Sequence, residues 1–406
     1  MTLDRRALRR HWTLDPEITF LNHGSFGACP VPVLEAQSEL RARMEREPVR
    51  FFIRELPGLA EAAAAEVGAF LGADAADLAF VSNATMGVNT VLRSLDLAPG
   101  DELLTHDHAY NACKNALDFV AEKAGAKVVV AKVPFPVASP DTVVDSVLAC
   151  VTSRTRLAMI DQITSPTALV FPVDRLVSAL AERGVDTLVD AAHAPGMVPL
   201  HLDRTGAAYT TGNFHKWTCA PKGAAFLHVR RDRQAQIRPL SISHGANAPR
   251  TERSRFRVEA DWTGTMDPTP ALCLPAALRF LGSLLPGGMS ALMEANRAEA
   301  LRAQTTIAGA LGVAPPCPPE MVGSMASFPV SADGPPTPPL GIDVLQDTLY
   351  QRFKIEIPVF PWPPLGKKII RFSTPIYIGA EEIARLASAL GELDLAGRSR
   401  REGHRS

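Results

Sequence analysis

The sequence lacks the cysteine patterns that would indicate a metal site. Its six cysteines form no CxxC pair and no Cys/His cluster with the spacing of a zinc site, so no metal is expected. Scattered thiols of this kind are typical of a reducing compartment, and a cytoplasmic location is expected. The charged N-terminus, MTLDRRALRRHW, lacks the apolar core of a signal peptide. No run approaches the roughly 20 apolar residues that would span a bilayer.

The chain also has almost no net charge. It carries 42 basic and 43 acidic residues, a formal net charge of -1, so neither nucleic acid nor a membrane surface is expected as a partner. The 46% of hydrophobic residues and 21% of charged residues are ordinary for a globular protein. A single domain typically has about 100–200 residues, so the 406 residues of this chain predict more than one domain.

Short β-branched runs alternate with helical patterns through the middle of the chain. This alternation predicts an α/β fold, a mostly parallel sheet with helices on both faces. Ligands of such sheets bind at the carboxyl ends of the strands. The predicted strands are Leu78–Ser82, Glu102–Thr105, Lys127–Val130, Leu157–Asp161, Thr187–Asp190, Ala207–Thr211 and Ala224–Val229.

The pattern changes after about Pro239, where long helical stretches are followed by isolated strands. Helices are predicted over residues 270–284, 290–311, 344–354 and 380–393, and strands over residues 324–330 and 369–373. We therefore predict a large ligand-binding domain, residues 71–265, and a smaller C-terminal α/β domain, residues 266–406. Residues 1–70 are predicted to form an arm and helices that belong to the smaller domain.

Two motifs stand at the ends of predicted strands. Ser82–Gly87 follows a strand and opens a helix, and free backbone N–H groups at such a helix start can bind a phosphate. The alternative is an ordinary N-cap. Asp190 ends a strand in VDAAHA, where a carboxylate can keep an aromatic ring nitrogen protonated and His193 can bond a phenolic oxygen. The alternative there is a solvated aspartate that begins a loop.

Two cationic residues complete the pattern. Lys216 follows a strand and stands between His215 and Trp217, where desolvation would lower its pKa and favour Schiff-base formation. The alternative is a surface lysine. Arg371 lies inside the predicted strand Ile369–Ser373, and its planar fork suits bidentate binding of a carboxylate. An internal salt bridge is the alternative. A lysine, an acid for the ring nitrogen and a phosphate site together suit pyridoxal 5'-phosphate (PLP).

The chain resembles the class V aminotransferase family of PLP enzymes, and within it the isopenicillin-N-epimerase-like branch. The resemblance extends over nearly the whole chain and implies the PLP-dependent transferase fold known as fold type I. The segments that carry it include LNHGSFG at Leu21–Gly27, TSPTALVFPV at Thr164–Val173, VDAAHAPGMVPL at Val189–Leu200, GNFHKWTCAPKGAAFL at Gly212–Leu227, WTGTMDPTP at Trp262–Pro270 and RFSTPIY at Arg371–Tyr377.

The resemblance implies roles for the matching residues. Lys216 would hold the cofactor as a Schiff base and move the proton, Asp190 would pair with the ring nitrogen, and His193 would contact the phenolic oxygen. His108, or else Tyr110, would stack on the ring. The other cofactor-binding residues would be Asn83, Ala84 and Thr85, with Asn213 and His215 nearby, Thr164 or Ser165 at the ring edge, and Thr265 reaching the phosphate of a partner subunit in a homodimer. The substrate would be bound by Arg371, with Asn22, His23 and Tyr110 close to it.

The implied reaction is proton abstraction at the Cα of an amino acid or amino-acid-derived substrate, followed by epimerisation through a quinonoid carbanion. The alternatives are β-elimination at a C–S bond of a cysteine conjugate, decarboxylation, transamination, or a non-catalytic scaffold of the same fold. Persulfide-forming desulfuration is not expected, because residues 341–370 contain no nucleophilic cysteine.

Overall fold

A computed structural model describes residues 3–249, 253–332, 337, 341–362 and 367–395. Its centre is a seven-stranded sheet with the order β2-β8-β7-β6-β5-β3-β4. β8 is antiparallel to both of its neighbours and all other pairs are parallel, which confirms the predicted α/β class. The strands are β2 (Leu78–Val81), β3 (Glu102–His106), β4 (Lys127–Ala131), β5 (Thr155–Asp161), β6 (Asp186–Asp190), β7 (Tyr209–Asn213) and β8 (Ala225–Val229).

Helices cover both faces of this sheet, because successive strand residues point to opposite sides. Leu103 and Leu157 pack on one face with α6 and α7. Leu104 and Ala158, the next residues of the same strands, pack on the other face with α8 and α9. These helices are α6 (Ala84–Ser94), α7 (Asn111–Ala124), α8 (Pro140–Leu148) and α9 (Val173–Ala181).

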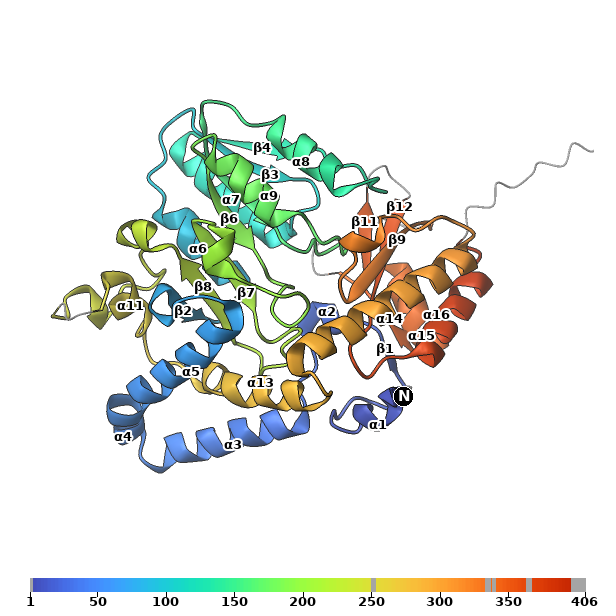
Figure 1. The fold of residues 1–406 in the computed structure, drawn as a ribbon, viewed down its shortest axis with the longest axis horizontal. Helices are drawn as coiled ribbons and strands as arrows, with labels where there is room; N and C mark the ends of the chain where they lie inside the picture. The colour runs from blue at the N-terminus through green and yellow to red at the C-terminus, as the bar shows by residue number, and fades with distance from the viewer. Residues whose placement is uncertain (1–2, 250–252, 333–336, 338–340, 363–366, 396–406) are drawn as a thin grey trace, which may run out of the picture.

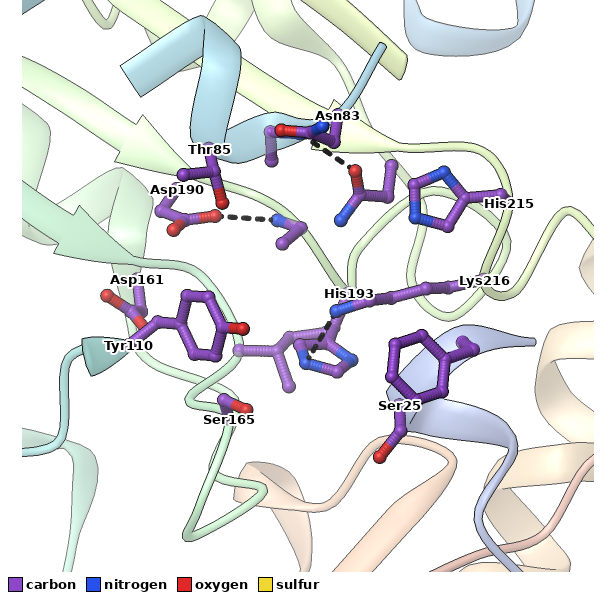
Figure 2. A pocket seen from close by; sticks show the side chains of 15 residues that line it. Ser25, Asn83, Thr85, Tyr110, Asp161, Ser165, Asp190, His193, His215 and Lys216 are labelled. Carbon is purple, nitrogen blue, oxygen red and sulfur yellow. Dashed lines mark hydrogen bonds between the residues drawn. The ribbon is translucent and has the colours of Figure 1, made fainter. Parts of the chain in front are cut away.

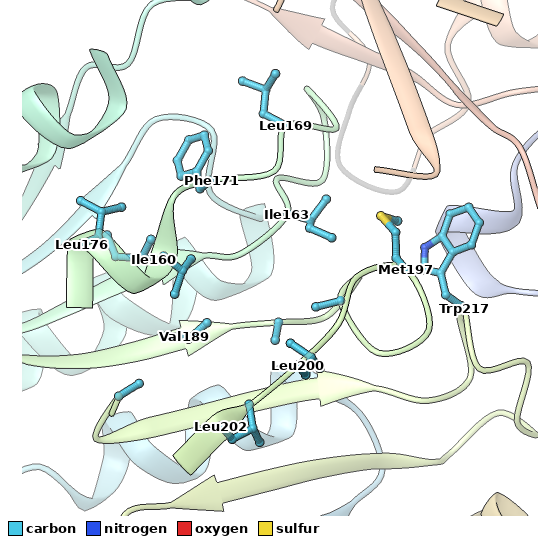
Figure 3. Packing of buried hydrophobic residues seen from close by; sticks show 14 of the residues in the cluster. Ile160, Ile163, Leu169, Phe171, Leu176, Val189, Met197, Leu200, Leu202 and Trp217 are labelled. Atoms are coloured by element: carbon cyan, nitrogen blue, oxygen red, sulfur yellow. The ribbon is translucent and has the colours of Figure 1, made fainter. Parts of the chain in front are cut away.

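The second of these faces extends to the loop after β7. Figure 3 shows Val189 and Ile160 of the sheet in the same core as Leu176 of α9, with Trp217 at its far end beside Met197. Trp217 is 3% exposed. The residue after Lys216 is therefore anchored in the core, which fixes the backbone of the lysine at the sheet edge.

A smaller sheet with the antiparallel order β11-β12-β9 lies beside the large one (Figure 1). The edge strand β11 was not predicted, because its sequence, VFPW, contains a proline, which is tolerated only at an edge. The elements of this part are α12 (Thr269–Leu272), α13 (Leu274–Ser283), α14 (Gly288–Leu311), β9 (Met325–Ser331), α15 (Val344–Phe353), β11 (Val359–Trp362), β12 (Lys367–Ser373) and α16 (Ala380–Glu392).

The N-terminal region is divided between the two parts, which corrects the prediction that all of residues 1–70 belong with the smaller one. Trp12 and Leu21 pack in the C-terminal core, and β1 (Thr19–Phe20) pairs with β10 (Ile355–Glu356). Val33 of α3 and Val67 of α5, however, pack in the core of the large sheet. The bounds of these helices are Val31–Arg46 for α3 and Leu56–Leu71 for α5.

Within the described ranges, no single helix is long and apolar enough to cross a membrane. One bent helix pair, Thr269–Ser283 with Gly288–Leu311, passes that test of length and composition when its two helices are taken together.

Candidate active site

A cavity opens where the carboxyl ends of β5, β6 and β7 meet the amino end of α6 (Figure 2). This is the edge at which parallel sheets bind ligands. The predicted site residues that line the cavity are Asn83, Ala84, Thr85, Tyr110, Asp190, His193, Asn213, His215 and Lys216. It is also lined by Ser25, Phe26, Asp161, Ile163, Ser165 and Ala192.

Lys216 extends into this cavity from the loop after β7. Its Nζ lies 3.1 Å from Nε2 of His193. The dashed line between the two side chains in Figure 2 marks this contact. Burial, and then the nearby charge of Arg371, lower the pKa of Lys216 to about 7. A substantial fraction of the amine is then uncharged near neutral pH, which is the form that attacks a carbonyl. Lys216 is therefore a nucleophile that faces a cavity, and the surface-lysine alternative does not hold.

Asp190, at the end of β6, is held by two donors. Its Oδ1 accepts a hydrogen bond of 3.0 Å from the backbone N–H of Ala192, and its Oδ2 accepts one of 3.2 Å from the thiol of Cys113. Only 3% of the residue is exposed, so the alternative of a solvated loop aspartate does not hold. Burial, and then the charge of Asp161, raise the pKa of Asp190 to about 6. Its carboxylate suits a cationic ring nitrogen.

His193 enters the cavity as a neutral side chain. Burial, followed by the charges of Lys216 and Arg371, holds its pKa well below the usual value. Its Nδ1 is buried without a hydrogen-bond partner among the described residues. A neutral imidazole with a free nitrogen can exchange a hydrogen bond with a ligand oxygen or with the lysine amine.

The start of α6 is both an N-cap and a wall of the cavity. Asn83 Oδ1 accepts a hydrogen bond of 2.8 Å from the N–H of Met86, which is the ordinary capping arrangement considered from the sequence. The N–H of Ala84 donates to Oδ1 of Asn213 at 2.8 Å. Thr85 and His215 complete this wall. The positive end of the helix dipole and these polar groups together suit an anion such as a phosphate.

Arg371 lies on β12, behind Ser25 and Ser165. It is 1% exposed and donates from Nη1 to the carbonyl of Ser165 at 2.6 Å and from Nη2 to Oγ of Ser25 at 2.9 Å. No acidic group of the described residues lies within salt-bridge distance, and its Nε has no hydrogen-bond partner there. The internal salt bridge is thus not found. A buried cation without a counter-ion is costly unless an anionic ligand compensates it.

Like Arg371, two other predicted substrate residues lie behind the cavity wall and not in its lining. His23 bonds Tyr377 Oη through Nδ1 at 2.7 Å and the carbonyl of Lys216 through Nε2 at 3.0 Å. Asn22 accepts a hydrogen bond of 2.5 Å from Ser25 and donates to Glu356. These side chains therefore hold Lys216 and Ser25 in place, and they do not line the cavity.

His108 is not in the cavity, which corrects its predicted position over the cofactor ring. Its two ring nitrogens bond Thr167 Oγ1 at 2.7 Å and the carbonyl of Val133 at 2.9 Å, and its ring packs against Trp362. Tyr110, two residues further on, lines the cavity and is 45% exposed. The chain turns after β3 so that the tyrosine, the alternative considered from the sequence, faces the space where a ring would bind.

Two further predicted cofactor residues lie elsewhere. Thr164 is fully buried and bonds Thr167 and the N–H of Leu169 inside its own loop, so Ser165 takes its predicted place at the cavity. Thr265 is exposed and does not line the cavity within this single chain.

Some residues of the site were missed from the sequence. Asp161 could have been found, because it ends the predicted strand Leu157–Asp161 and the strand-end rule used for Asp190 applies equally to it. Ser25 and Phe26 had no such signal. They reach the cavity because β1 pairs with β10, residues more than 300 positions away.

Taken together, the residues fit PLP. The lysine can bind the aldehyde, Asp190 the ring nitrogen, the start of α6 the phosphate, and Tyr110 the ring face. Buried polar atoms that have no partner among the described residues, Nδ1 of His193 and Oδ1 of Asp161, also suit a polar ligand.

The chain belongs to the class V aminotransferase family. The family model described as Aminotransferase class-V matches residues 30–330. The chain is 36% identical to isopenicillin N epimerase of Amycolatopsis lactamdurans, over 95% of this chain and 97% of that protein. It is 32% identical to the protein of the same name from Streptomyces clavuligerus, over 96% and 98%. It is also 30% identical to a probable chloroplastic L-cysteine desulfhydrase of Arabidopsis thaliana, over 93% and 83%.

Solved structures confirm fold type I. The cystine C-S lyase C-DES, in complex with cysteine persulfide, is similar with a TM-score of 0.74 at 21% identity, over 93% of this chain and 98% of that one. The cysteine desulfurase CsdA of Escherichia coli is similar with a TM-score of 0.75 at 18% identity, over 97% and 98%.

Proposed function

We propose that this chain is a PLP-dependent enzyme that epimerises the Cα of an amino acid or an amino-acid-derived substrate. The observation that carries the proposal is Lys216, whose pKa is lowered to about 7 and whose amine shares one cavity with the buried Asp190. Family membership and the relatives named isopenicillin N epimerase support it. A non-catalytic scaffold would leave this pair of an activated lysine and a buried acid without a use.

Bound PLP supplies an electron sink for the electrons of a broken Cα bond. The protein would supply the remaining functions. Lys216 would attach the cofactor and take the Cα proton, and a proton must return to the opposite face of Cα for the configuration to invert. Asp190 would keep the ring nitrogen protonated. Tyr110 would cover the ring, and Asn83, Ala84, Thr85, Asn213 and His215 would surround the phosphate. Arg371, reached past Ser25 and Ser165, binds the substrate carboxylate.

The cofactor assignment is tested by trapping. The protein is incubated with PLP, reduced with borohydride and digested, and the peptides are analysed by mass spectrometry. We expect the pyridoxyl group on Lys216, and its loss in Lys216→Ala. The matched control is Lys222→Ala in the same loop, whose amine bonds the carbonyl of Gly27 and which should still be labelled at Lys216. A wild-type protein that takes up no label contradicts the proposal.

The reaction is tested with a panel of amino acids in deuterated water. Epimerisation incorporates deuterium at Cα and inverts its configuration without loss of any substituent. A second candidate, β-elimination, is favoured by the relatives named L-cysteine desulfhydrase. From cysteine it would release sulfide, ammonia and pyruvate with consumption of one water. Racemised substrate supports the first reaction, whereas stoichiometric sulfide and pyruvate support the second.

We also propose a homodimer in which the exposed Thr265 reaches the phosphate site of the partner subunit. Phe52 contacts Trp262 with ring centroids 5.9 Å apart, so the segment around Phe52 lies next to the loop that carries Thr265. Large apolar side chains are exposed on both segments. Val49 is 72% exposed, Ile53 69% and Met266 52%. Such a surface favours burial against a second copy.

A cytoplasmic location is the third part of the proposal. All six cysteines are free, and five of them have a pKa raised chiefly by burial, which is typical of unreactive thiols in a reducing compartment. Fractionation of the source cells would test it.

A further inference from the structure

A second carboxyl group lies beside Asp190. Asp161 ends β5 and is the direct partner of Asp190 in the parallel register of β5 and β6. It lines the cavity, and Figure 2 shows it below Asp190 and next to Tyr110. Only 2% of Asp161 is exposed, and its Oδ1 is a buried atom without a hydrogen-bond partner among the described residues. Two carboxyl groups therefore lie side by side at the wall of the cavity, each almost fully buried.

The carboxyl groups of Asp190 and Asp161 differ in the hydrogen-bond donors that surround them. Asp190 receives a donor on each oxygen, the Ala192 N–H and the Cys113 thiol. Among the described residues, no lysine or arginine is paired with Oδ1 of Asp161. The nearest ring nitrogen, Nε2 of His106, lies 3.4 Å away, but it accepts the backbone N–H of Asp161 and therefore carries a lone pair on that side. Burial lowers the pKa of His106 to about 4, so this imidazole is neutral.

Neighbouring carboxyl groups with this asymmetry do not both ionise, because two like charges close together in a buried site repel each other strongly. Asp190 receives the better hydrogen-bond donors, so Asp190 is the group that ionises. Burial raises the pKa of Asp161 to about 8, against the opposing effects of the Tyr110 N–H and the charges of Lys114 and Lys216. The pKa of Asp161 is thus higher than that of Asp190, in agreement with the hydrogen bonds that each carboxyl group receives.

We propose that Asp161 is a further residue of the cofactor site, which stays protonated at neutral pH and offers its hydroxyl as a donor to bound PLP while Asp190 is the ionised partner of the ring nitrogen. The inference rests on the proposed function, since PLP is taken as the occupant. The acceptor on the ring that remains after the nitrogen and the phosphate are assigned is the phenolic oxygen, which has lone pairs for a hydrogen bond from Asp161 as well as one from His193. A carboxylate at Asp161 would repel that oxygen, whereas a neutral acid can bond it.

The test measures the dissociation constant of PLP from the apo-protein between pH 6 and 9. Asp161→Asn keeps the shape and an uncharged donor. We expect it to bind PLP within about threefold of the wild type at pH 7, and to lose the weakening that the wild type shows as pH rises through about 8. Asp161→Ala should bind about five- to tenfold more weakly at pH 7, as expected for one lost hydrogen bond.

A second measurement needs no cofactor. The infrared spectrum of the apo-protein at pH 7 should contain a protonated-carboxyl band that disappears in Asp161→Asn. The matched control is Asp186→Asn at the opposite end of β6, whose carboxylate is paired with Arg233 and which should leave the band unchanged. Circular dichroism establishes that each variant is folded.

Two outcomes overturn the inference. A loss of PLP affinity in Asp161→Asn at pH 7 of more than about tenfold, which exceeds one neutral hydrogen bond, or an unchanged carboxyl band, would show that Asp161 is ionised. Unchanged affinity in Asp161→Ala would show that it does not touch the cofactor. If the wild-type protein binds no PLP, the proposed function is wrong instead. The infrared band of the apo-protein then still shows whether Asp161 is protonated, so the two proposals can be refuted separately.

Discussion

Replacement of Arg371 by lysine isolates the geometry of the guanidinium, because the charge is kept. Arg371 donates from Nη1 to the carbonyl of Ser165 at 2.6 Å and from Nη2 to Oγ of Ser25 at 2.9 Å. Its Nε has no hydrogen-bond partner among the described residues. An ammonium group is a single point and cannot hold both serines and a carboxylate in one plane. One charge-assisted hydrogen bond contributes about 1.5–3 kcal/mol. At about 1.4 kcal/mol per tenfold change, substrate binding should weaken roughly 10- to 150-fold.

The assay separates binding from turnover. We expect KM, or the dissociation constant of a substrate measured from the visible absorbance of the holoenzyme, to rise by this factor, while kcat falls less. The matched control is Arg297→Lys on α14, since Arg297 also donates to two acceptors, the carbonyls of Val322 and Pro319, but lies away from the cavity. It should leave KM unchanged. If Arg371→Lys lowers the melting temperature but its folded fraction keeps the wild-type KM, the arginine is structural and the reasoning is refuted.

Four other outcomes are expected. Asp190→Asn should retain PLP but exchange the Cα proton at least about a hundredfold more slowly, because a neutral amide does not keep the ring nitrogen protonated; near-normal exchange in deuterated water would contradict this. The rate of covalent PLP attachment should rise with pH and level off above about 7, since the pKa of Lys216 is lowered to about 7 and only the uncharged amine attacks; a rate that is flat from pH 6 to 8 would show an amine already free. Gly27→Ala should lower the melting temperature, because Gly27 has φ 68° and ψ 152° and its Cβ would lie 2.2 Å from the carbonyl of His215, whereas Gly309→Ala on α14, with open space around it, should not. Mixed dimers of Lys216→Ala with a bulky Thr265 variant should regain part of the activity if sites are shared, since one site then carries neither defect; no recovery in verified heterodimers would place the phosphate site within one chain.

The seven strands of the large sheet could be predicted from the sequence because they are short β-branched runs, although some of their ends differ by up to two residues from the prediction. Lys216 and Asp190 were found by the same means, since Asp190 ends such a run and Lys216 follows another within a few residues. The choice between His108 and Tyr110 could not be made, because it depends on the turn after β3 and on partners in other loops, Thr167 and Val133.

The contribution of the N-terminal residue Ser25 to the site could not be predicted from sequence patterns for a related reason. Ser25 reaches Arg371 only because β1 pairs with β10 and because Gly27 allows the chain to pass against the backbone of Lys216. Contacts between residues more than 300 positions apart carry no local signal. The asymmetry between Asp161 and Asp190 likewise depends on donors from other elements, above all the Cys113 thiol of α7.

The cationic groups of the site belong to different sheets. Lys216 follows β7 of the large sheet, and Arg371 lies on β12 of the small one, with Ser25 and Ser165 as the contacts that join them. An amino acid bound at its amino end near the large sheet and at its carboxyl end by Arg371 of the small sheet would connect the two sheets. Ligand occupancy should therefore restrain the two parts against each other, so that protection of the connecting segments from proteolysis reports on substrate binding even when no chemistry follows.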